Sequence, residues 1–493
     1  MDRSRTPGIR LHIRALLVLC MLHGTGMLLC AQSESSDFAR IGHAAFLSTT
    51  ATDYQCVGVN PANLGFVPET EIFTLAEPLG SGVSRRRKDW AFTMLEGGAS
   101  VHSNAISKDG LLDVILQQGG VKFTPEQKVA AADAFSGNGI RFNADIILIG
   151  LSVQTQWAGG IAFTVRERGS GNFVLNNEAA SVIFEGRQAA YFDSLAVNWR
   201  GDTVGFAKRP KRYSELFNGT TLSMVWYREY AASYGVRLLN FRNVKLYAGV
   251  TAKALEAFAY LDARADGTNF AARSALSPYF GINYGNANTP SYIPGSALAP
   301  VGLGWGMDLG ATLELGDLTL SASMIDLGKM TFDGNVFTAG DTVLNGLSST
   351  GFNNYNIFNE AQLITGDGGF FKWGGLQTAA TELPTRAKFG ASYFVNYRTR
   401  IGVDVIASIN RSAGSLEQPL VSAGIDYRPL TWIKLGSGVG WGGTMGVFVP
   451  VSVMFSFFGG TWELGVSSRD VVTYLAAKQP VMSLAIGVMR LRF

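Results

Sequence analysis

The sequence has few cysteines, few histidines and few charged residues, and each shortage argues against a class of protein. Of 493 residues, three are cysteine and four are histidine, and 16% are charged, below the roughly 25% of soluble globular proteins. Cys20 and Cys30 lie in the N-terminal stretch that we expect to be removed, so Cys56 has no partner for an intramolecular disulfide. These numbers exclude a small secreted scaffold that depends on disulfides.

Long hydrophobic runs are also missing after the first 31 residues, although 47% of the chain is hydrophobic. A transmembrane helix needs about 20 consecutive apolar residues, and no such run is present. An apolar chain without these helices is either a large soluble β protein or a membrane β-barrel, whose strands alternate apolar and polar residues.

The first 31 residues form a predicted signal peptide. Four arginines precede an apolar stretch, and Leu29-Cys30-Ala31 offers a small residue for cleavage before Gln32. A lipoprotein cut before Cys30 is the alternative, which the bulky Leu29 disfavours. Removing the segment takes away four Arg and one Asp and leaves 37 basic and 37 acidic residues, so the charge balance predicts no nucleic-acid partner.

Segments with period-two alternation fill most of the remaining chain. Between Trp305 and Leu313, apolar residues alternate with Gly, Asp and Thr, and Gly316-Asp317 marks a hairpin turn. Strand side chains point to two faces in turn, so each segment has one apolar face and one polar or glycine face. We predict an all-β fold, a single antiparallel transmembrane β-barrel of about 12–16 strands with 14 favoured.

Two kinds of region interrupt this alternation. Residues 107–118 and 124–135 are predicted to be short helices, the second with Thr124 as its N-cap. Residues 262–300 and 331–383 are long and rich in Gly, Asn, Ser and Thr. Because outer-membrane barrels keep short turns in the periplasm and long loops outside, we expect both regions to be extracellular loops.

The chain ends with apolar residues that alternate with arginine. Leu491 and Phe493 resemble the C-terminal strand signal that the barrel insertion machinery reads, although any strand can end a chain. Together with the signal peptide, this ending predicts a Gram-negative outer-membrane protein that is surrounded by lipid.

Residues that could carry out catalysis are scarce. His43 and His102 are the histidines outside the signal peptide, and the sequence has no recognisable metal-binding, nucleophile or phosphate-binding motif. We therefore predict no enzyme activity, no metal and no cofactor. Asp308, Glu314 and Asp326 lie on or beside strands and are candidates to line the lumen, as polar residues do in any barrel.

The densest basic run extends from Arg85 to Lys88. It could contact anionic lipid headgroups or an acidic partner. A solvated turn between two strands is the simpler interpretation, because loops are normally polar.

A distinctive segment, Thr52 to Phe66, lies near the start of the expected mature chain. Its Pro61 fixes its own φ and restricts the preceding Asn60 to extended conformations. The Asn60 side chain can also satisfy nearby backbone groups. The segment therefore predicts a specified turn, with an ordinary connection into the first strand as the structural alternative.

This segment resembles the N-terminus of the long-chain fatty-acid outer-membrane transporter superfamily. The resemblance implies that residues 32–70 fold as a plug, or hatch, inside a barrel of residues 71–493. The plug residues that it implies are Asn60, Pro61, Ala62 and Leu64.

Much of the remaining chain resembles a family of uncharacterised outer-membrane barrels from bacteria that use type IX secretion and gliding. That family implies no established activity. The stretches that carry the resemblance are Glu229–Gly235, Tyr247–Lys253, Gly304–Gly310, Ile325–Lys329 and Leu383-Pro384.

Two functions follow as expectations. The first is passive transport or capture of a small hydrophobic compound, which would enter an apolar pocket from the loop side and pass when the segment around Asn60 moves. The alternative is an accessory barrel of a secretion, gliding or surface-assembly system. Such a barrel would hold a secretion or surface protein through residues 262–300 and 331–383.

Overall fold

The computed structural model describes part of the chain. The described residues are 40–66, 69–73, 83–107, 122–199, 201–285, 288–355, 360–416, 418–443, 446–476 and 481–493, and they belong to the second of two compact units, Ala31–Phe493. The predicted signal peptide and its cleavage site lie outside them, as does nearly all of the helix predicted at 107–118. Within them, no helix is long and apolar enough to cross a membrane.

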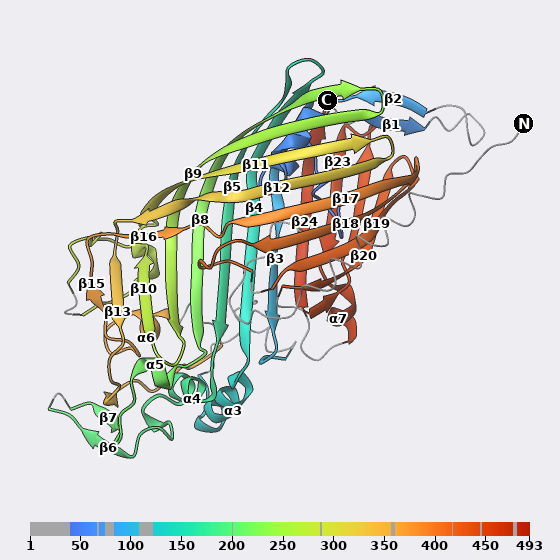
Figure 1. The fold of residues 1–493 in the computed structure, drawn as a ribbon. Helices are drawn as coiled ribbons and strands as arrows, with labels where there is room; N and C mark the ends of the chain where they lie inside the picture. Colours follow the sequence, from blue (N-terminus) through green and yellow to red (C-terminus); the bar gives the residue numbers. More distant parts are fainter. Residues whose placement is uncertain are drawn as a thin grey trace, which may run out of the picture. The chain divides into compact units, whose positions relative to one another are not determined.

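A closed barrel of 14 antiparallel strands dominates the described residues (Figure 1). The strand β24 pairs with β3 and closes the cylinder, which confirms the predicted fold class and strand number. In order around the wall, the strands are β3 (Trp90–Ser103), β4 (Gly139–Thr155), β5 (Gly159–Val174), β8 (Thr221–Phe241), β9 (Val244–Ala265), β11 (Gly302–Leu315), β12 (Leu318–Phe332), β17 (Arg386–Asn396), β18 (Thr399–Ser408), β19 (Leu420–Leu430), β20 (Ile433–Gly442), β22 (Val451–Phe457), β23 (Trp462–Ser468) and β24 (Val481–Arg492).

Shorter elements surround this wall. The strands that extend it are β10 (Phe270–Leu276), β13 (Val336–Gly340), β15 (Gly374–Gly375), β16 (Ala379–Glu382) and β21 (Gly446–Phe448). The strands β1 (Glu69–Phe73) and β2 (Val83–Arg87) form a two-stranded sheet, and β6 (Ser194–Val197), β7 (Thr203–Phe206) and β14 (Gly346–Leu347) form another small sheet. The helices are α3 (Pro125–Phe135), α4 (Asn177–Glu185), α5 (Tyr213–Leu216), α6 (Ala361–Thr365) and α7 (Val471–Ala476).

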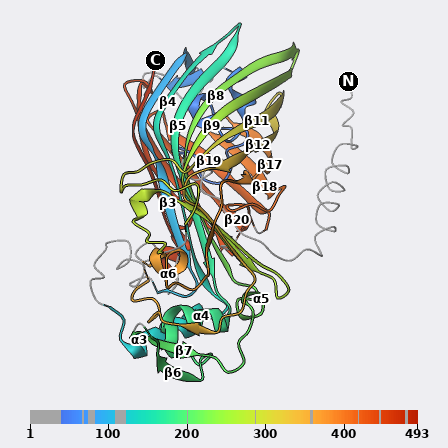
Figure 2. The same cartoon turned by 90° about the vertical axis from the view of Figure 1, so that its left-hand side faces the viewer.

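The two ends of the barrel differ in their connections (Figures 1 and 2). Turns of a few residues join β4 to β5, β8 to β9 and β11 to β12 at one end, which we call the short-turn end. Gly316, at φ +63°, forms the predicted turn with Asp317, and the backbones of Trp90 and Phe493 pair at this end too. The long connections, with α3, α4 and the small β6–β7–β14 sheet, lie at the other end, which we call the loop end.

The loop end is more ordered than the composition predicts. Residues 262–300 and 331–383 both begin as wall strands, and β10 and β13 pair with each other beyond the main wall. The prediction of weakly periodic loops was therefore wrong for these short strands, whose pairing depends on neighbours far away in sequence. The helix α3 covers the span predicted, and Thr124 forms a capping box with Gln127.

The wall has an apolar outside and a polar or glycine inside. On β11, Leu303 is 60% exposed and Trp305 is 55% exposed, whereas Asp308 and Thr312, at even-numbered positions of the same strand, are buried. Other wall strands repeat this pattern, with Ile401 of β18 among the exposed residues. An exterior of this kind is unfavourable in water and suits a hydrocarbon environment.

Candidate functional site

Residues 40–66, which we call the N-terminal segment, lie inside the barrel against inward-facing side chains of its strands. The segment contains η2 (Asp53–Cys56) and η3 (Pro61–Gly65). Its buried residues are all those of 40–66 apart from Ala44, Thr50, Thr52 and Phe66. The segment is therefore packed against the inside of the wall over most of its length.

The predicted turn is the 3-10 helix η3. Asn60 caps it by accepting a hydrogen bond from the backbone N–H of Ala62 at 3.1 Å. The same side chain donates through Nδ2 to the Thr312 hydroxyl of β11 at 2.9 Å, and that hydroxyl donates to Asn63 at 2.7 Å. Pro61 occupies the first helical position, and Leu64 is fully buried. The structure thus brings the four predicted plug residues into one turn that is bound to the wall.

A row of glycines receives this turn. The row runs across four adjacent strands in direct register, at Gly160, Gly235, Gly249 and Gly310. A Cβ on Gly249 or Gly235 would lie closer than 3.0 Å to backbone atoms of Pro61, a separation that real Cβ atoms essentially never show. Glycine is therefore required for η3 to lie directly on the backbone of the wall.

Two buried carboxylates hold other parts of the N-terminal segment. Asp404 of β18 accepts hydrogen bonds from the backbone N–H groups of residues 47 and 48, at 2.7 and 2.9 Å. Glu96 of β3 accepts hydrogen bonds from the Tyr54 hydroxyl and the Gln55 side chain, each at 2.6 Å. Hydrogen bonds to ionised groups are strong but can be exchanged for bonds to water, so these anchors are compatible with release of the segment.

An ionic layer lies next to the N-terminal segment. Lys253 Nζ is 2.6 Å from carboxylate oxygens of both Asp308 and Asp326, and Asp326 also pairs with Arg168 at 2.9 Å and Arg386 at 2.7 Å. The layer consists of the buried residues Asp145, Arg166, Arg168, Glu229, Lys253, Asp308, Asp326 and Arg386. The layer contacts the segment, because Arg166 donates to the Val57 carbonyl at 3.4 Å.

The structure places the three predicted lumen residues in two different environments. Asp308 and Asp326 face inward, where they are buried in ion pairs. Glu314 lies away from them, near the short-turn end, where it accepts a hydrogen bond from Tyr247 at 2.9 Å and pairs with Lys245 at 3.2 Å.

The strand β9 shows the order of the interior layers along the barrel. From the short-turn end, Lys245 lines a cavity, Gly249 supports the N-terminal segment and Lys253 belongs to the ionic layer. Leu255 then belongs to an apolar cluster, and Leu261 belongs to the core of the loop end. Because strand residues advance by about 3.3 Å each, these layers follow one another along the barrel.

The loop half of the interior is apolar and closely packed. The apolar cluster consists of Tyr227, Leu255, Ala257, Tyr260, Ala275, Val301, Met330, Phe332, Val336, Leu383 and Ala413. Further out, the rings of Tyr213, Phe270 and Phe371 pack together at centroid separations of 5.0–5.5 Å. Aromatic side chains thus fill this end, where we expected an apolar pocket.

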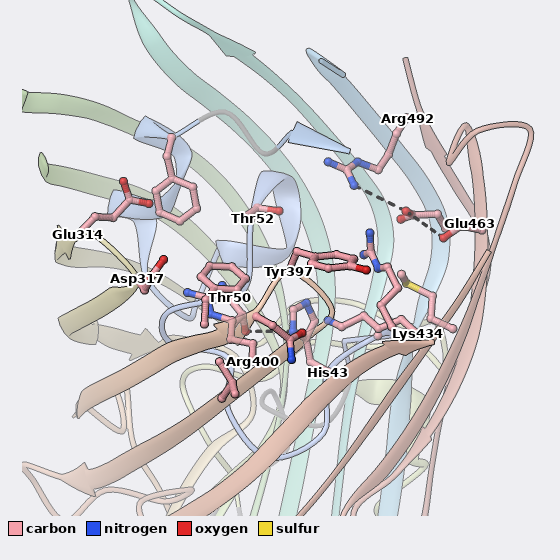
Figure 3. Close-up of a pocket in the computed structure, with 18 of the residues that line it drawn as sticks. His43, Thr50, Thr52, Glu314, Asp317, Tyr397, Arg400, Lys434, Glu463 and Arg492 are labelled. Carbon is pink, nitrogen blue, oxygen red and sulfur yellow. Dashed lines mark hydrogen bonds and ion pairs between the residues drawn. The ribbon is translucent and has the colours of Figure 1, made fainter. Parts of the chain in front are cut away.

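A cavity of about 840 Å³ occupies the short-turn end, between the N-terminal segment and the wall (Figure 3). Its basic residues are Arg237, Lys245, Arg400, Arg428, Lys434, Arg490 and Arg492, and its acidic residues are Glu314, Asp317 and Glu463. His43 and Thr50 of the segment face it, with Nδ1 of His43 3.1 Å from the Thr50 hydroxyl. Burial lowers the pKa of His43 well below 6.5, and Lys434, Arg490 and Arg400 lower the pKa further.

Two further predicted sites are the C-terminal strand β24 and the basic run that ends at Lys88. Arg490 points inward and pairs with Asp53 of the N-terminal segment at 2.6 Å, whereas Phe493 is exposed. The insertion role of Leu491 and Phe493 stays a prediction. Lys88 donates hydrogen bonds to Thr461, at 2.8 Å, and to a backbone carbonyl of β24.

Sequence comparison places the chain in a family. Residues 87–440 match a family of unknown function (DUF5723). The chain belongs to this family. No curated protein sequence matches the chain. That the family occurs in bacteria that use type IX secretion and gliding stays a prediction.

Several solved barrels are similar to the chain at low sequence identity. The toluene transporter TbuX of Ralstonia pickettii is 10% identical with a TM-score of 0.41, over 94% of this chain and 99% of that one. The toluene transporter TodX of Pseudomonas putida is 10% identical with a TM-score of 0.39, over 94% and 98%. A Pseudomonas aeruginosa FadL homologue is 11% identical with a TM-score of 0.37, over 95% and 97%.

Proposed function

We propose that the protein is an outer-membrane barrel that passes or captures a small hydrophobic compound, with the N-terminal segment as its movable plug. The apolar exterior of the wall supports a membrane location, because lipid replaces the water that such a surface would otherwise meet. Long connections at one end and short turns at the other support an orientation with the loop end outside the cell.

The position of the N-terminal segment carries this proposal. It lies between the ionic layer and the cavity, so a compound can cross only after the segment moves. A compound that arrives from the loop end meets Leu255, Met330 and other apolar side chains before it reaches the ionic layer. This apolar half of the interior favours a hydrophobic compound, since each polar group would lose its bonds to water there.

The contacts of the segment are compatible with a rare open state. Its polar anchors are hydrogen bonds and ion pairs, each of which contributes about 0.5–3 kcal/mol net because water can replace the partner. Apolar residues of the segment, among them Leu47, Val59 and Leu64, also pack against Ile147 and other apolar residues of the wall, and this contact adds to the free energy of docking. A minor state that lies a few kcal/mol above the docked state is populated at about 0.1–10%. Passage through such a state is slow but needs no energy source.

A disulfide that fixes the N-terminal segment to the wall tests the proposal. A Cβ on Gly436 of β20 would lie 3.1 Å from the Cβ of Ala44, close to the roughly 3.5–4.5 Å of a disulfide. In a Cys56→Ser background, we expect the Ala44→Cys, Gly436→Cys variant to block uptake of toluene and octane by cells when oxidised. Uptake should return when the disulfide is reduced.

The two single-cysteine variants are the matched controls, and they should take up both compounds at one rate under oxidising and reducing conditions. Equal uptake by the oxidised and reduced double variant, with the disulfide verified by mass spectrometry, would show that the segment does not gate the path.

The strand β6 favours a second candidate, an accessory barrel that binds a surface protein. β6 is the edge of its three-stranded sheet, and Leu195 is 54% exposed while Val197 is 69% exposed. Its sequence has no charge or proline to protect the edge, so an extended segment of a partner could pair with it. A stoichiometric surface protein that co-purifies with the barrel, and is lost when residues 194–206 are removed, would favour this function.

A further inference from the structure

We infer that the cavity at the short-turn end binds the carboxylates of an acidic peptide segment that belongs to a periplasmic protein. The structure shows the cavity and its lining residues directly. That the cavity faces the periplasm rests on the proposed function. Passage of a hydrophobic compound does not explain why the cavity at the short-turn end is lined by so many basic residues, and an acidic partner does.

Positive charge exceeds negative charge around this cavity. Seven lining residues are Lys or Arg and three are Asp or Glu. Lys245 pairs with Glu314, and Arg490 and Arg492 pair with Glu463. In the part of the chain that the structure describes, Arg237, Arg400 and Arg428 of the lining make no ion pair within 4.0 Å. Within the described residues, the charge of these three guanidinium groups is therefore not neutralised by a carboxylate at this distance. Arg400 donates its hydrogen bonds to uncharged groups, the hydroxyls of Ser392 and Thr319 and the Thr49 carbonyl.

The densest part of this charge lies on three adjacent strands. Arg400 is on β18, Arg428 on β19 and Lys434 on β20, and the buried Asp426 pairs with Lys434 at 2.9 Å. Arginine side chains suit carboxylates because their planar donors match both oxygens. Exposed aromatic side chains next to them, Phe394 and Tyr397, offer contact area to a peptide.

A second group of cations makes a single small anion a poor match for the site. Arg237 of β8 and Lys245 of β9 line the same cavity, and β11, β12 and β17 separate their strands from β18 along the wall. A ligand that contacts both groups must carry several negative charges and extend across the cavity. An acidic peptide does so, since successive residues of an extended chain are about 3.3 Å apart.

The cavity also connects ligand binding to the N-terminal segment. His43, Thr50 and Thr52 of the segment line it (Figure 3). Arg400 donates a hydrogen bond to the Thr49 carbonyl at 3.3 Å. A carboxylate that takes over Arg400 removes this anchor, so the peptide and the docked segment compete. Binding of the peptide therefore favours release of the segment, and the coupling is reciprocal.

Fluorescence anisotropy with the full-length protein in a non-ionic detergent tests the inference. The probe is a labelled peptide with six consecutive glutamates, and a peptide with six lysines is its control. We expect the glutamate peptide to bind and the lysine peptide not to bind, and we expect salt to weaken binding because the contacts are ionic. This first test uses the unmodified protein, so its result does not depend on whether a variant folds.

Charge-removing variants then locate the site. Arg400→Gln, Arg428→Gln and Lys434→Gln together should weaken binding by about tenfold or more, because three charged contacts to the peptide are lost. The matched control is Lys208→Gln, Arg209→Gln and Arg212→Gln at the loop end, which makes the same change in net charge and should leave the affinity unchanged. The heat-dependent gel mobility of folded barrels verifies that each variant is folded.

Three results would overturn the inference. The first is no binding of the glutamate peptide to the folded protein, and the second is equal weakening by both sets of variants. The third is binding of succinate or inorganic phosphate, measured by calorimetry, without binding of the peptide, which would identify a small-anion site. None of these results affects the disulfide test of the plug, because peptide binding is measured without transport.

Discussion

Inward-facing glycines determine where the N-terminal segment can lie, because each leaves space that a larger side chain would occupy. Gly249 and its neighbours accept the η3 turn, and Gly438 faces Ala45 elsewhere on the wall. A methyl group at either position would meet atoms of the segment that have no free space to move into. Part of the high glycine content of the chain therefore serves close packing of one segment against the inside of the barrel.

Replacing Gly249 with alanine should weaken docking of the N-terminal segment. The new methyl group would overlap with backbone atoms of Pro61 and Ala62, so the turn must shift away from the wall. We expect the free energy of docking to fall by about 1–3 kcal/mol, the usual cost of overpacking. Hydrogen exchange of residues 60–65, measured by mass spectrometry, reports this change.

Gly169→Ala on β5 is the matched control, because a Cβ there would have a neighbour only at 3.9 Å. It should leave exchange of residues 60–65 as it is in the unmodified protein. If Gly249→Ala also left exchange unchanged, the segment would not rest on the glycine row.

The positions of the buried charged residues, but not their partners, could be predicted in part from the sequence. Asp308 faces inward, as the alternation along its strand suggests, whereas strict alternation with Met324 would point Asp326 outward. A bulge at Asp326, at φ +62°, turns that side chain into the barrel. The pairing of Asp308 and Asp326 with Lys253 could not be predicted, because it depends on the register between β9 and β11, which residues 266–301 separate in the sequence. Asp404 and Glu96 escaped notice for the same reason, since nothing local distinguishes an anchoring carboxylate from any other inward-facing polar residue.

The N-terminal segment, considered as one element, depends on a histidine that stays uncharged. The docked segment holds the pKa of His43 well below 6.5, mainly through burial and also through Lys434, Arg490 and Arg400, while the Gln55 side chain opposes this shift. Because the released segment binds a proton more readily, docking is fully stable above about pH 6.5 and weakens as the pH falls below it. The slope is about 1.4 kcal/mol per pH unit for one proton.

We therefore expect the segment to open more often at pH 5.5 than at pH 7.5. Hydrogen exchange of residues 41–52, corrected for the intrinsic effect of pH on exchange, measures this directly. His43→Gln should remove most of the difference between the two pH values. A pH effect of the same size in the His43→Gln variant would assign the effect to carboxylates such as Asp404 instead.

Elements with local signals were predicted, and elements with long-range causes were missed. The helix α3 has a capping box and a proline at its start, which are visible in a few residues of sequence. The helix α4 was missed because its Val182, Ile183 and Phe184 form a short apolar run that suits a strand equally well. The strands β10 and β13 form only because neighbouring strands extend beyond the main wall.

At the scale of the whole molecule, the interior changes character along the barrel. The loop half is apolar, the middle contains the ionic layer and the N-terminal segment, and the short-turn end is a cationic cavity. The sequence predicted the barrel, its strand number and the turn at Asn60, because alternation, short turns and the Asn60-Pro61 pair are local. The order of the interior layers follows from packing around a closed wall, which no single segment reveals.

Ion conductance across a planar lipid bilayer tests most directly whether the N-terminal segment closes the barrel. The full-length protein is compared with a variant that lacks residues 40–66 and is otherwise unchanged. The account predicts that the full-length barrel is mostly closed, with rare brief openings, and that the variant conducts steadily. Equal, low conductance of the two proteins would contradict the account, because the ionic layer and the loop end would then close the barrel without the segment.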